Sequence, residues 1–225
     1  MPAENAPRAE ASGADGWVVV LPVKHARHGK RRLQGGPLRS TAADRSALAR
    51  ALATDALAAV RSCHLVRGLV VVTGDPAVAA SARAAGDDVL AGDDRGLDAA
   101  VEMGLAHAAQ RWPGLGCAVL LADVPALRSE QLERALTAAA AHPRSFVPDL
   151  EGRGTVLLAA RPGVEARPAF GAGSAERHER LGAVRLDLDL PGLRRDVDTL
   201  DDLRGAVALG VGPATRAVLA GTGLA

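Results

Sequence analysis

The chain has 225 residues, 48% of them apolar, and its 27 basic and 26 acidic side chains leave a net charge of only +1. This length suffices for one domain with a sizeable core, and the balanced charge argues against a nucleic-acid-binding face. Aromatic residues make up 2% of the chain, which argues against base stacking on single strands. Two cysteines suggest neither a disulfide framework nor a metal site, so we expect a reduced, cytoplasmic protein.

The first residues carry no apolar run. Residues 1–16 are polar and rich in Ala, Glu and Gly, so they predict a disordered tail rather than a signal peptide. No stretch of the sequence is long and apolar enough to span a bilayer, and we expect no membrane association. Residues 17–225 are predicted to form a single domain.

Apolar runs alternate with helical patterns in the first half of the chain. The run WVVVLPV at 17–23 predicts a strand buried on both faces. A helix over 41–60 follows, then a strand at 69–73, a short Ala-rich helix at 77–85 and a strand at 88–91. This order is typical of a parallel sheet covered by helices.

The same alternation continues to residue 160. A helix is expected over 96–112 and a buried strand over 117–122. Ser129 is expected to cap a helix that runs to about Ala141. The segments SFVPD and TVLLAA then predict two more strands, at 145–149 and 155–160.

The last third is less regular. Residues 162–173 are loop-like, with two Pro and three Gly, and a helix is expected over 174–181. The alternating AVRLDLDL at 183–190 predicts a half-exposed strand, and a helix follows over 199–209. We therefore predict an α/β fold with a mostly parallel central sheet, in which ligands bind at the carboxyl ends of the strands.

Positive charge is concentrated directly after the first strand. Six cations and no acid occur between Lys24 and Arg39, with Arg27 and Lys30 among them. Cations in this place can bind a polyphosphate. The spacing matches neither a P-loop nor a dinucleotide fingerprint. The alternative is an ordinary solvated run of charge.

Acidic residues follow two other expected strand or loop ends. Asp123 comes where the strand at 117–122 ends, and Asp196 and Asp198 are two residues apart in RDVDT. Carboxylates placed in this way can hold a hard cation such as Mg²⁺ together with substrate phosphates. The alternative is that Asp123 caps a turn and that Asp198 or Thr199 caps the following helix.

Two glycine-rich segments, GRGTVLL at 152–158 and FGAGSAERH at 170–178, complete the candidate residues. Glycine lets a backbone approach a ligand closely, Thr155 adds a hydroxyl, and Ser174 opens a helix whose free N–H groups favour an anion. The alternative is two ordinary turns with a capping serine. The histidines, His178 included, show no metal-ligand spacing and are given no catalytic role.

Taken in order, the chain contains LPVK, GKRRL, VVTGD, GLDAAV, LLADVPAL, EGRGTVLLAA, FGAGSAERH and LRRDVDTLDDL. Over residues 17 to about 217, this series resembles the guanylyltransferase family of coenzyme F-420 biosynthesis. Members of that family join GTP to phosphoenolpyruvate or 2-phospho-L-lactate and release pyrophosphate. The resemblance implies a Rossmann-like nucleotidyltransferase fold of the GT-A type.

The resemblance also implies roles for particular residues. It places the acceptor on Thr155, Gly171 and Ser174, and Mg²⁺ on Asp123 and Asp196, with Asp198 as an addition. It implies that Lys24, Arg27 and Lys30 bind the triphosphate, with Asp123, Lys24 and Lys30 directly serving catalysis. Asp98 stands where the family usually has Asn, at a position expected to contact the nucleotide. The product is expected to pass to a transferase that uses the deazaflavin precursor Fo.

Two alternatives share parts of this pattern. Nucleotidyltransferases of molybdenum cofactor maturation and of sugar phosphates have the same fold and the same acidic residue at a strand end. A non-catalytic nucleotide-binding module is the second alternative, and Asp98 in place of Asn favours it.

Overall fold

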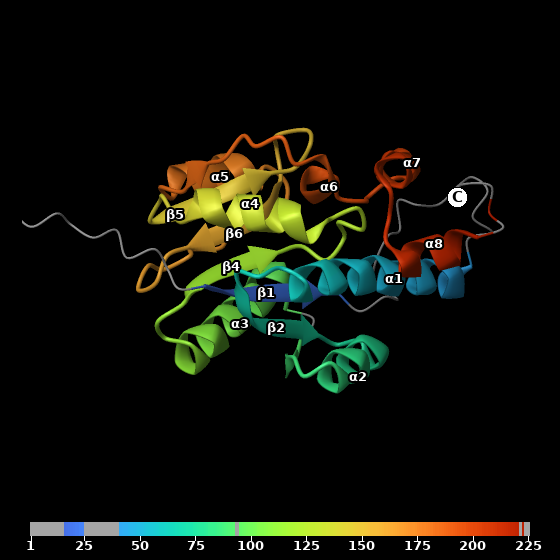
Figure 1. Ribbon diagram of the computed structural model, residues 1–225, viewed down its shortest axis with the longest axis horizontal. Coiled ribbons are helices and arrows are strands. Elements are labelled where there is room, and N and C mark those ends of the chain that lie inside the picture. The colour runs from blue at the N-terminus through green and yellow to red at the C-terminus, as the bar shows by residue number, and fades with distance from the viewer. Residues whose placement is uncertain (1–15, 25–40, 93–94, 221, 223–225) are drawn as a thin grey trace, which may run out of the picture.

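A computed structural model describes residues 16–24, 41–92, 95–220 and 222. These residues form one seven-stranded sheet in the order β3-β2-β1-β4-β6-β5-β7, with helices on both faces (Figure 1). The predicted α/β class is confirmed.

Parallel pairing joins the first four strands: β1 (Trp17–Val23), β2 (Val66–Thr73), β3 (Asp88–Ala91) and β4 (Gly116–Leu120). All seven residues of β1 are buried, as the unbroken apolar run predicted. Strands covered on both faces need apolar side chains at every position, which is why this segment lacks alternation.

The other strands reverse direction once. β6 (Thr155–Ala160) is antiparallel both to β4 and to β5 (Arg144–Pro148), and the short β7 (Val184–Arg185) is parallel to β5. Among the described strands, β6 alone runs against the rest, so the prediction of a mostly parallel sheet holds. The amino-terminal end of β6 consequently lies beside the carboxyl end of β4, at the same end of the sheet.

Two apolar cores lie on opposite faces of the sheet. Trp17, Val19 and Leu21 of β1 face the core formed with α1 (Ala42–Arg61), α2 (Pro76–Ala84) and α4 (Ser129–Ala139). Val18 and Val20, which alternate with them, face the core formed with α3 (Leu97–Arg111) and α5 (Ser174–Arg180). The period of two along β1 thus assigns each helix to a face.

The predicted elements need three corrections. Arg128, not Ser129, occupies the N-cap position of α4, and Ser129 is its first helical residue. Of the strand expected over 183–190, only Val184–Arg185 is a strand, because after one further bond to β5, from the Leu186 N–H to the Phe146 carbonyl (2.9 Å), the segment forms hydrogen bonds within itself. The prediction also lacked the short helices α6 (Pro191–Arg194) and α8 (Pro213–Leu219).

The C-terminal helices pack against α1. Asp55 of α1 is 6% exposed, and its carboxylate accepts hydrogen bonds from the N–H groups of Ala214 (3.0 Å) and Thr215 (2.8 Å). Asp55 therefore satisfies the otherwise unpaired donors at the start of α8 from 159 residues away in sequence. α7 (Leu200–Leu209) is capped locally by Thr199.

Across the described ranges, no helix is long and apolar enough to cross a bilayer. The expected tail at 1–16 lies outside the described residues except for Gly16. The prediction of a single domain over 17–225 stays a prediction.

Helix α3 packs tightly against the sheet at Gly104, so we expect this position to be intolerant of a side chain. A Cβ added there would lie 2.3 Å from Cγ1 of Val20 and 3.1 Å from Cγ2 of Val72. Overpacking of this kind costs about 1–3 kcal/mol. Urea unfolding should show Gly104→Ala to be destabilised by this amount, and less so in a Val20→Ala background. Equal loss in both backgrounds would contradict the proposed clash.

Candidate active site

The candidate site lies at the carboxyl end of β4. The Leu121 N–H, just beyond this strand, donates to the Val156 carbonyl at 3.0 Å and so extends the pairing of β4 with β6. Thr155, the first residue of β6, and Asp123, three residues after β4, therefore lie at the same sheet edge. The antiparallel direction of β6 is what brings them together.

The RDVDT segment reaches the same edge through one backbone contact. The Val197 N–H donates to the Asp123 carbonyl at 3.0 Å, and Val197 is fully buried. Asp196 and Asp198 flank this anchor, so the backbone of Asp196 lies close to that of Asp123. Thr199 caps α7 in a capping box with Asp202, so helix capping and carboxylate placement coexist in this segment.

The acidic residues at this edge fit a hard cation. Asp123 and Asp196 are partly buried and Asp198 is exposed. Within the described part of the chain, no three potential metal ligands converge, so Asp198 does not complete a three-carboxylate set with the other two. Mg²⁺ is commonly bound by one or two carboxylates, with water and substrate phosphates completing its six ligands. The pair Asp123 and Asp196 suits that mode.

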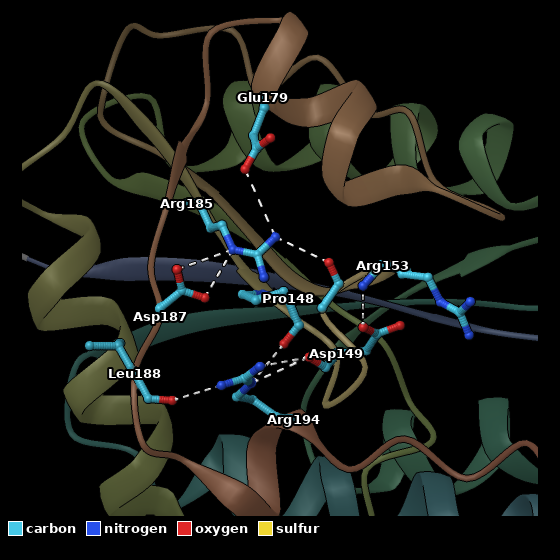
Figure 2. A network of polar contacts seen from close by, with 9 residues as sticks. Pro148, Asp149, Arg153, Glu179, Arg185, Asp187, Leu188 and Arg194 are labelled. Atoms are coloured by element: carbon cyan, nitrogen blue, oxygen red, sulfur yellow. Dashed lines mark hydrogen bonds and ion pairs between the residues drawn. The ribbon is translucent and has the colours of Figure 1, made fainter.

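Side chains hold the β5–β6 loop that precedes Thr155 (Figure 2). The Asp149 carboxylate accepts from the N–H groups of Arg153 (2.8 Å) and Gly154 (2.7 Å). A Cβ at Gly154 would lie 2.3 Å from this carboxylate. The second glycine of GRGT, Gly154, thus permits the close approach of the Asp149 carboxylate. The sequence did not suggest this role.

Two arginines bind the carbonyls of the same loop (Figure 2). Arg194 donates to the carbonyls of Pro148 (3.2 Å), Asp149 (2.9 Å) and Leu188 (3.4 Å). Arg185 donates to the Gly152 carbonyl (3.1 Å) and pairs with Asp187 and, at 3.9 Å, with Glu179. Since Arg194 precedes Asp196 by two residues, it links the carboxylate segment to the loop that carries Thr155.

The segment from Ala169 to Ala172 is held by Arg177 of α5. Its guanidinium donates to the carbonyls of Ala169 (3.0 Å), Phe170 (2.7 Å) and Ala172. Gly171 has a φ of +103°, which ordinary side chains rarely adopt. One side chain from the AERH part of the motif therefore orders its FGAG part.

His178 joins this segment to Thr155. Its Nδ1 lies 2.9 Å from Thr155 Oγ1, and its Nε2 accepts from the Ala169 N–H at 3.0 Å. The imidazole is fully buried between the rings of Phe146 and Phe170. The pKa of His178 is lowered to about 4, mainly by burial and secondly by the nearby charge of Arg177, while Asp98 acts in the opposite direction. The imidazole is thus neutral near pH 7.

Asp98, at the start of α3, contacts the segment from Ala169 to Ala172. Its Oδ1 accepts from the Phe170 N–H at 2.9 Å. Asn at this position could make the same bond through its own Oδ1, so the two residues differ only in charge and in the remaining atom. This contact places Asp98 beside Gly171. Its predicted contact with the nucleotide stays a prediction.

The start of α5 differs from expectation. Gly173, with a φ of +72°, is the N-cap residue, and Ser174 is the first helical residue. The N–H groups of Ser174 and Ala175 are not free, since they donate to the carbonyls of Gly171 (3.0 Å) and Arg153 (3.1 Å). The expectation of free N–H groups there is therefore wrong. The same bonds bring Ser174 and Gly171 close to the loop that carries Thr155.

The predicted triphosphate site is described only in part. Lys24 is exposed and directly follows β1, the neighbour of β4 in the sheet. Arg27 and Lys30 lie outside the described residues. The nucleotide-binding roles of these three cations stay predictions.

Sequence reasoning missed Arg177, His178 and Arg194. Each binds groups outside its own helix, and such contacts leave no periodic pattern in a sequence. The only available signal was their position within the motifs FGAGSAERH and LRRDVDT.

The fold is that of known nucleotidyltransferases. The sequence profile of the MobA-like NTP transferase domain matches residues 41–187. A solved nucleotidyl transferase from Methanothermobacter has the same fold, with a TM-score of 0.57 at 18% identity over 86% of this chain and 97% of that one. A structure from Desulfovibrio desulfuricans G20, described as a nucleotide-diphospho-sugar transferase, aligns with a TM-score of 0.65 at 17% identity, covering 92% and 96%.

Curated relatives are closer in sequence. The phosphoenolpyruvate guanylyltransferase of Streptomyces scabiei is 49% identical, covering 91% of this chain and 96% of the relative. That of Geodermatophilus obscurus is 48% identical, covering 91% and 94%. The chain is a nucleotidyltransferase, and it belongs to the phosphoenolpyruvate guanylyltransferase family.

Because His178 is neutral when folded and has an ordinary pKa of 6.5 when unfolded, we expect it to make stability pH-dependent. Between pH 6.5 and 4 the unfolded state binds more protons than the folded state. The contribution of His178 to the free energy of unfolding is therefore fully present above pH 6.5 and is lost as the pH falls toward 4. From pH 7 to 5 this amounts to about 2 kcal/mol.

Urea unfolding at pH 7 and 5 would measure this loss. In His178→Phe the difference in the free energy of unfolding between pH 7 and pH 5 should shrink by about that amount. His64→Gln, a change of an exposed histidine, should leave this difference unchanged. An unchanged difference in His178→Phe would contradict the assignment.

Asp98 should be replaceable by Asn but not by Ala. Asp98→Ala leaves the Phe170 N–H without its acceptor in a residue that is 7% exposed, at a cost of about 1–3 kcal/mol. Asp98→Asn retains the acceptor and should unfold at nearly the wild-type urea concentration. Equal destabilisation by both changes would show that the charge, not the hydrogen bond, stabilises this contact.

Proposed function

We propose that this protein transfers a guanylyl group from GTP to the phosphate of phosphoenolpyruvate, with 2-phospho-L-lactate as the alternative acceptor. The products are enolpyruvyl- or lactyl-diphospho-guanosine and pyrophosphate. The observation that carries the proposal is the meeting of Asp123, Asp196 and Thr155 at one sheet edge. The names of relatives at 44–49% identity support the substrate assignment.

The reaction needs alignment more than covalent chemistry from the protein. An oxygen of the acceptor phosphate attacks the α-phosphorus of GTP, a new P–O bond forms, and the bond to the leaving pyrophosphate breaks. Several negative charges must approach one another, so positioning and electrostatic stabilisation determine the rate.

Different groups of residues would bind the acceptor, the triphosphate and the cation. Thr155, Gly171 and Ser174 would hold the acceptor, on loops that Arg177 and Arg194 already order. Lys24 and the cations of the following segment would bind the triphosphate and the leaving pyrophosphate. Asp123 and Asp196 would hold Mg²⁺, which when bound neutralises phosphate charge and orients the reacting oxygens.

The proposed biological setting is coenzyme F-420 biosynthesis. A diphosphate ester of this kind is an activated donor, so a transferase that uses Fo is the expected consumer. The rival functions are another nucleotidyltransferase of the same fold and a non-catalytic nucleotide-binding module. Release of pyrophosphate that depends on the acceptor separates the proposal from the binding module, and identification of the product separates it from the sister enzymes.

Asp123 provides the test of the site. Asp123→Asn removes a charge expected to hold the cation while it keeps the shape of the side chain, so we expect at least a hundredfold loss of kcat with an unchanged melting temperature. The assay measures pyrophosphate release with GTP, Mg²⁺ and each acceptor, with Fo and its transferase present to trap the product. Asp201→Asn, at an aspartate whose side chain is 89% exposed, is the matched control. Turnover retained by Asp123→Asn would overturn the assignment.

A further inference from the structure

The hydrogen bonds of His178 determine which of its nitrogens carries the proton. A backbone amide can only donate, so the Ala169 N–H at 3.0 Å requires an unprotonated Nε2. A neutral imidazole then carries its proton on Nδ1, which faces Thr155 Oγ1 at 2.9 Å. The Nδ1–H must donate, and the Thr155 oxygen must accept.

This assignment determines whether the Thr155 hydroxyl can donate a hydrogen bond to a ligand. Since its oxygen accepts from His178, its own hydrogen is not directed at the imidazole and remains available as a donor. With the opposite tautomer, Thr155 would donate to Nδ1 and would present only lone pairs to a ligand. A phosphate or carboxylate accepts hydrogen bonds, so only the first arrangement attracts an anion.

We propose that His178 is a positioning residue, which holds the Thr155 hydroxyl as a hydrogen-bond donor toward the anionic groups of the acceptor. The chain of contacts runs from the Ala169 N–H through the imidazole to Thr155 and then to the substrate. This inference rests on the proposed function, because it takes a phosphorylated acid as the ligand of Thr155.

The groups around the imidazole hold it in this orientation and tautomer. Arg177 holds the Ala169 carbonyl, so the amide that selects the tautomer belongs to an ordered segment. The rings of Phe146 and Phe170 lie 5.9 Å and 5.1 Å from the imidazole, measured between centroids. The charged groups that act on His178 are Arg177 of its own helix and Asp98 of α3, and their effects oppose each other. Both ring nitrogens are thus used, and ring reversal would break both bonds.

The arrangement also couples the two glycine-rich segments. The segment at 169–172 supplies the amide, and the β5–β6 loop leads into Thr155. Displacement of the first segment would remove the Ala169 N–H that donates to His178 Nε2, and the imidazole could then adopt the other tautomer. The hydroxyl of Thr155 is therefore a donor only while the segment around Gly171 is in place.

The first test is a double-mutant cycle in steady-state kinetics. Thr155→Val removes the hydroxyl at nearly constant shape, His178→Phe keeps a ring but removes both nitrogens, and Thr155→Ser keeps a hydroxyl. We expect Thr155→Val and His178→Phe each to lower kcat/KM for the acceptor about ten- to hundredfold. The double variant should lose no more than Thr155→Val alone, the KM for GTP should stay within about twofold, and Thr155→Ser should retain most activity.

A purely structural role predicts a different cycle. His178→Phe would then lower kcat/KM by the same factor in the wild-type and Thr155→Val backgrounds, and would raise the KM for GTP as well. Either result overturns the proposal.

The second test reads the tautomer in the wild-type protein and uses Thr155→Val only to assign the signals. A two-bond proton–nitrogen correlation spectrum of wild-type protein labelled with ¹⁵N-histidine, recorded at pH 7, reports the tautomer of each imidazole. We expect His178 to be protonated on Nδ1 and unprotonated on Nε2, and its signals to shift in Thr155→Val, which assigns them. Protonation on Nε2 would overturn the proposal. Lack of wild-type turnover with every acceptor would overturn the proposed function instead, while the spectrum would still decide the tautomer.

Discussion

The antiparallel pairing of β6 with the end of β4 is the constraint on which the candidate site depends. A parallel strand would begin at the opposite edge of the sheet, and Thr155 would then lie far from Asp123. Because β6 reverses, its first residue meets the last residues of β4, and the Val197–Asp123 backbone bond adds the second carboxylate segment. Three segments separated by about thirty to forty residues each thus meet, and main-chain hydrogen bonds join each of the other two to the end of β4.

Side chains from three helices and from one of the loops themselves satisfy the backbone of the loops around this end of the sheet. Arg177 and Arg194 bind carbonyls, whereas Asp98, Asp149 and His178 accept from N–H groups. Loops with their polar groups paired in this way are ordered before a ligand arrives, and binding then has less conformational entropy to overcome. For a reaction that depends on alignment, this order is the main contribution that a protein can make.

The same contacts limit which cations can serve the nucleotide. Arg177, Arg185 and Arg194 lie near the β5–β6 loop or the segment at 169–172. Their guanidinium groups bind carbonyls or nearby carboxylates. Positive charge for a triphosphate must therefore come from elsewhere, and Lys24 with the cation-rich segment after it is the source that we propose. A protein of net charge +1 can in this way hold a strongly anionic substrate through local charge.

The sequence by itself determined the buried strands, most helix boundaries and the residues gathered at strand ends, because apolar periodicity and capping are local properties. It also indicated Asp123, Thr155 and Asp196 one by one. Only the tertiary structure decided that β6 is antiparallel, that the helix expected to offer free N–H groups at Ser174 has them bonded, and that His178 faces Thr155. These features depend on which backbone groups and side chains meet in the folded chain, and no spacing of residue types encodes such contacts.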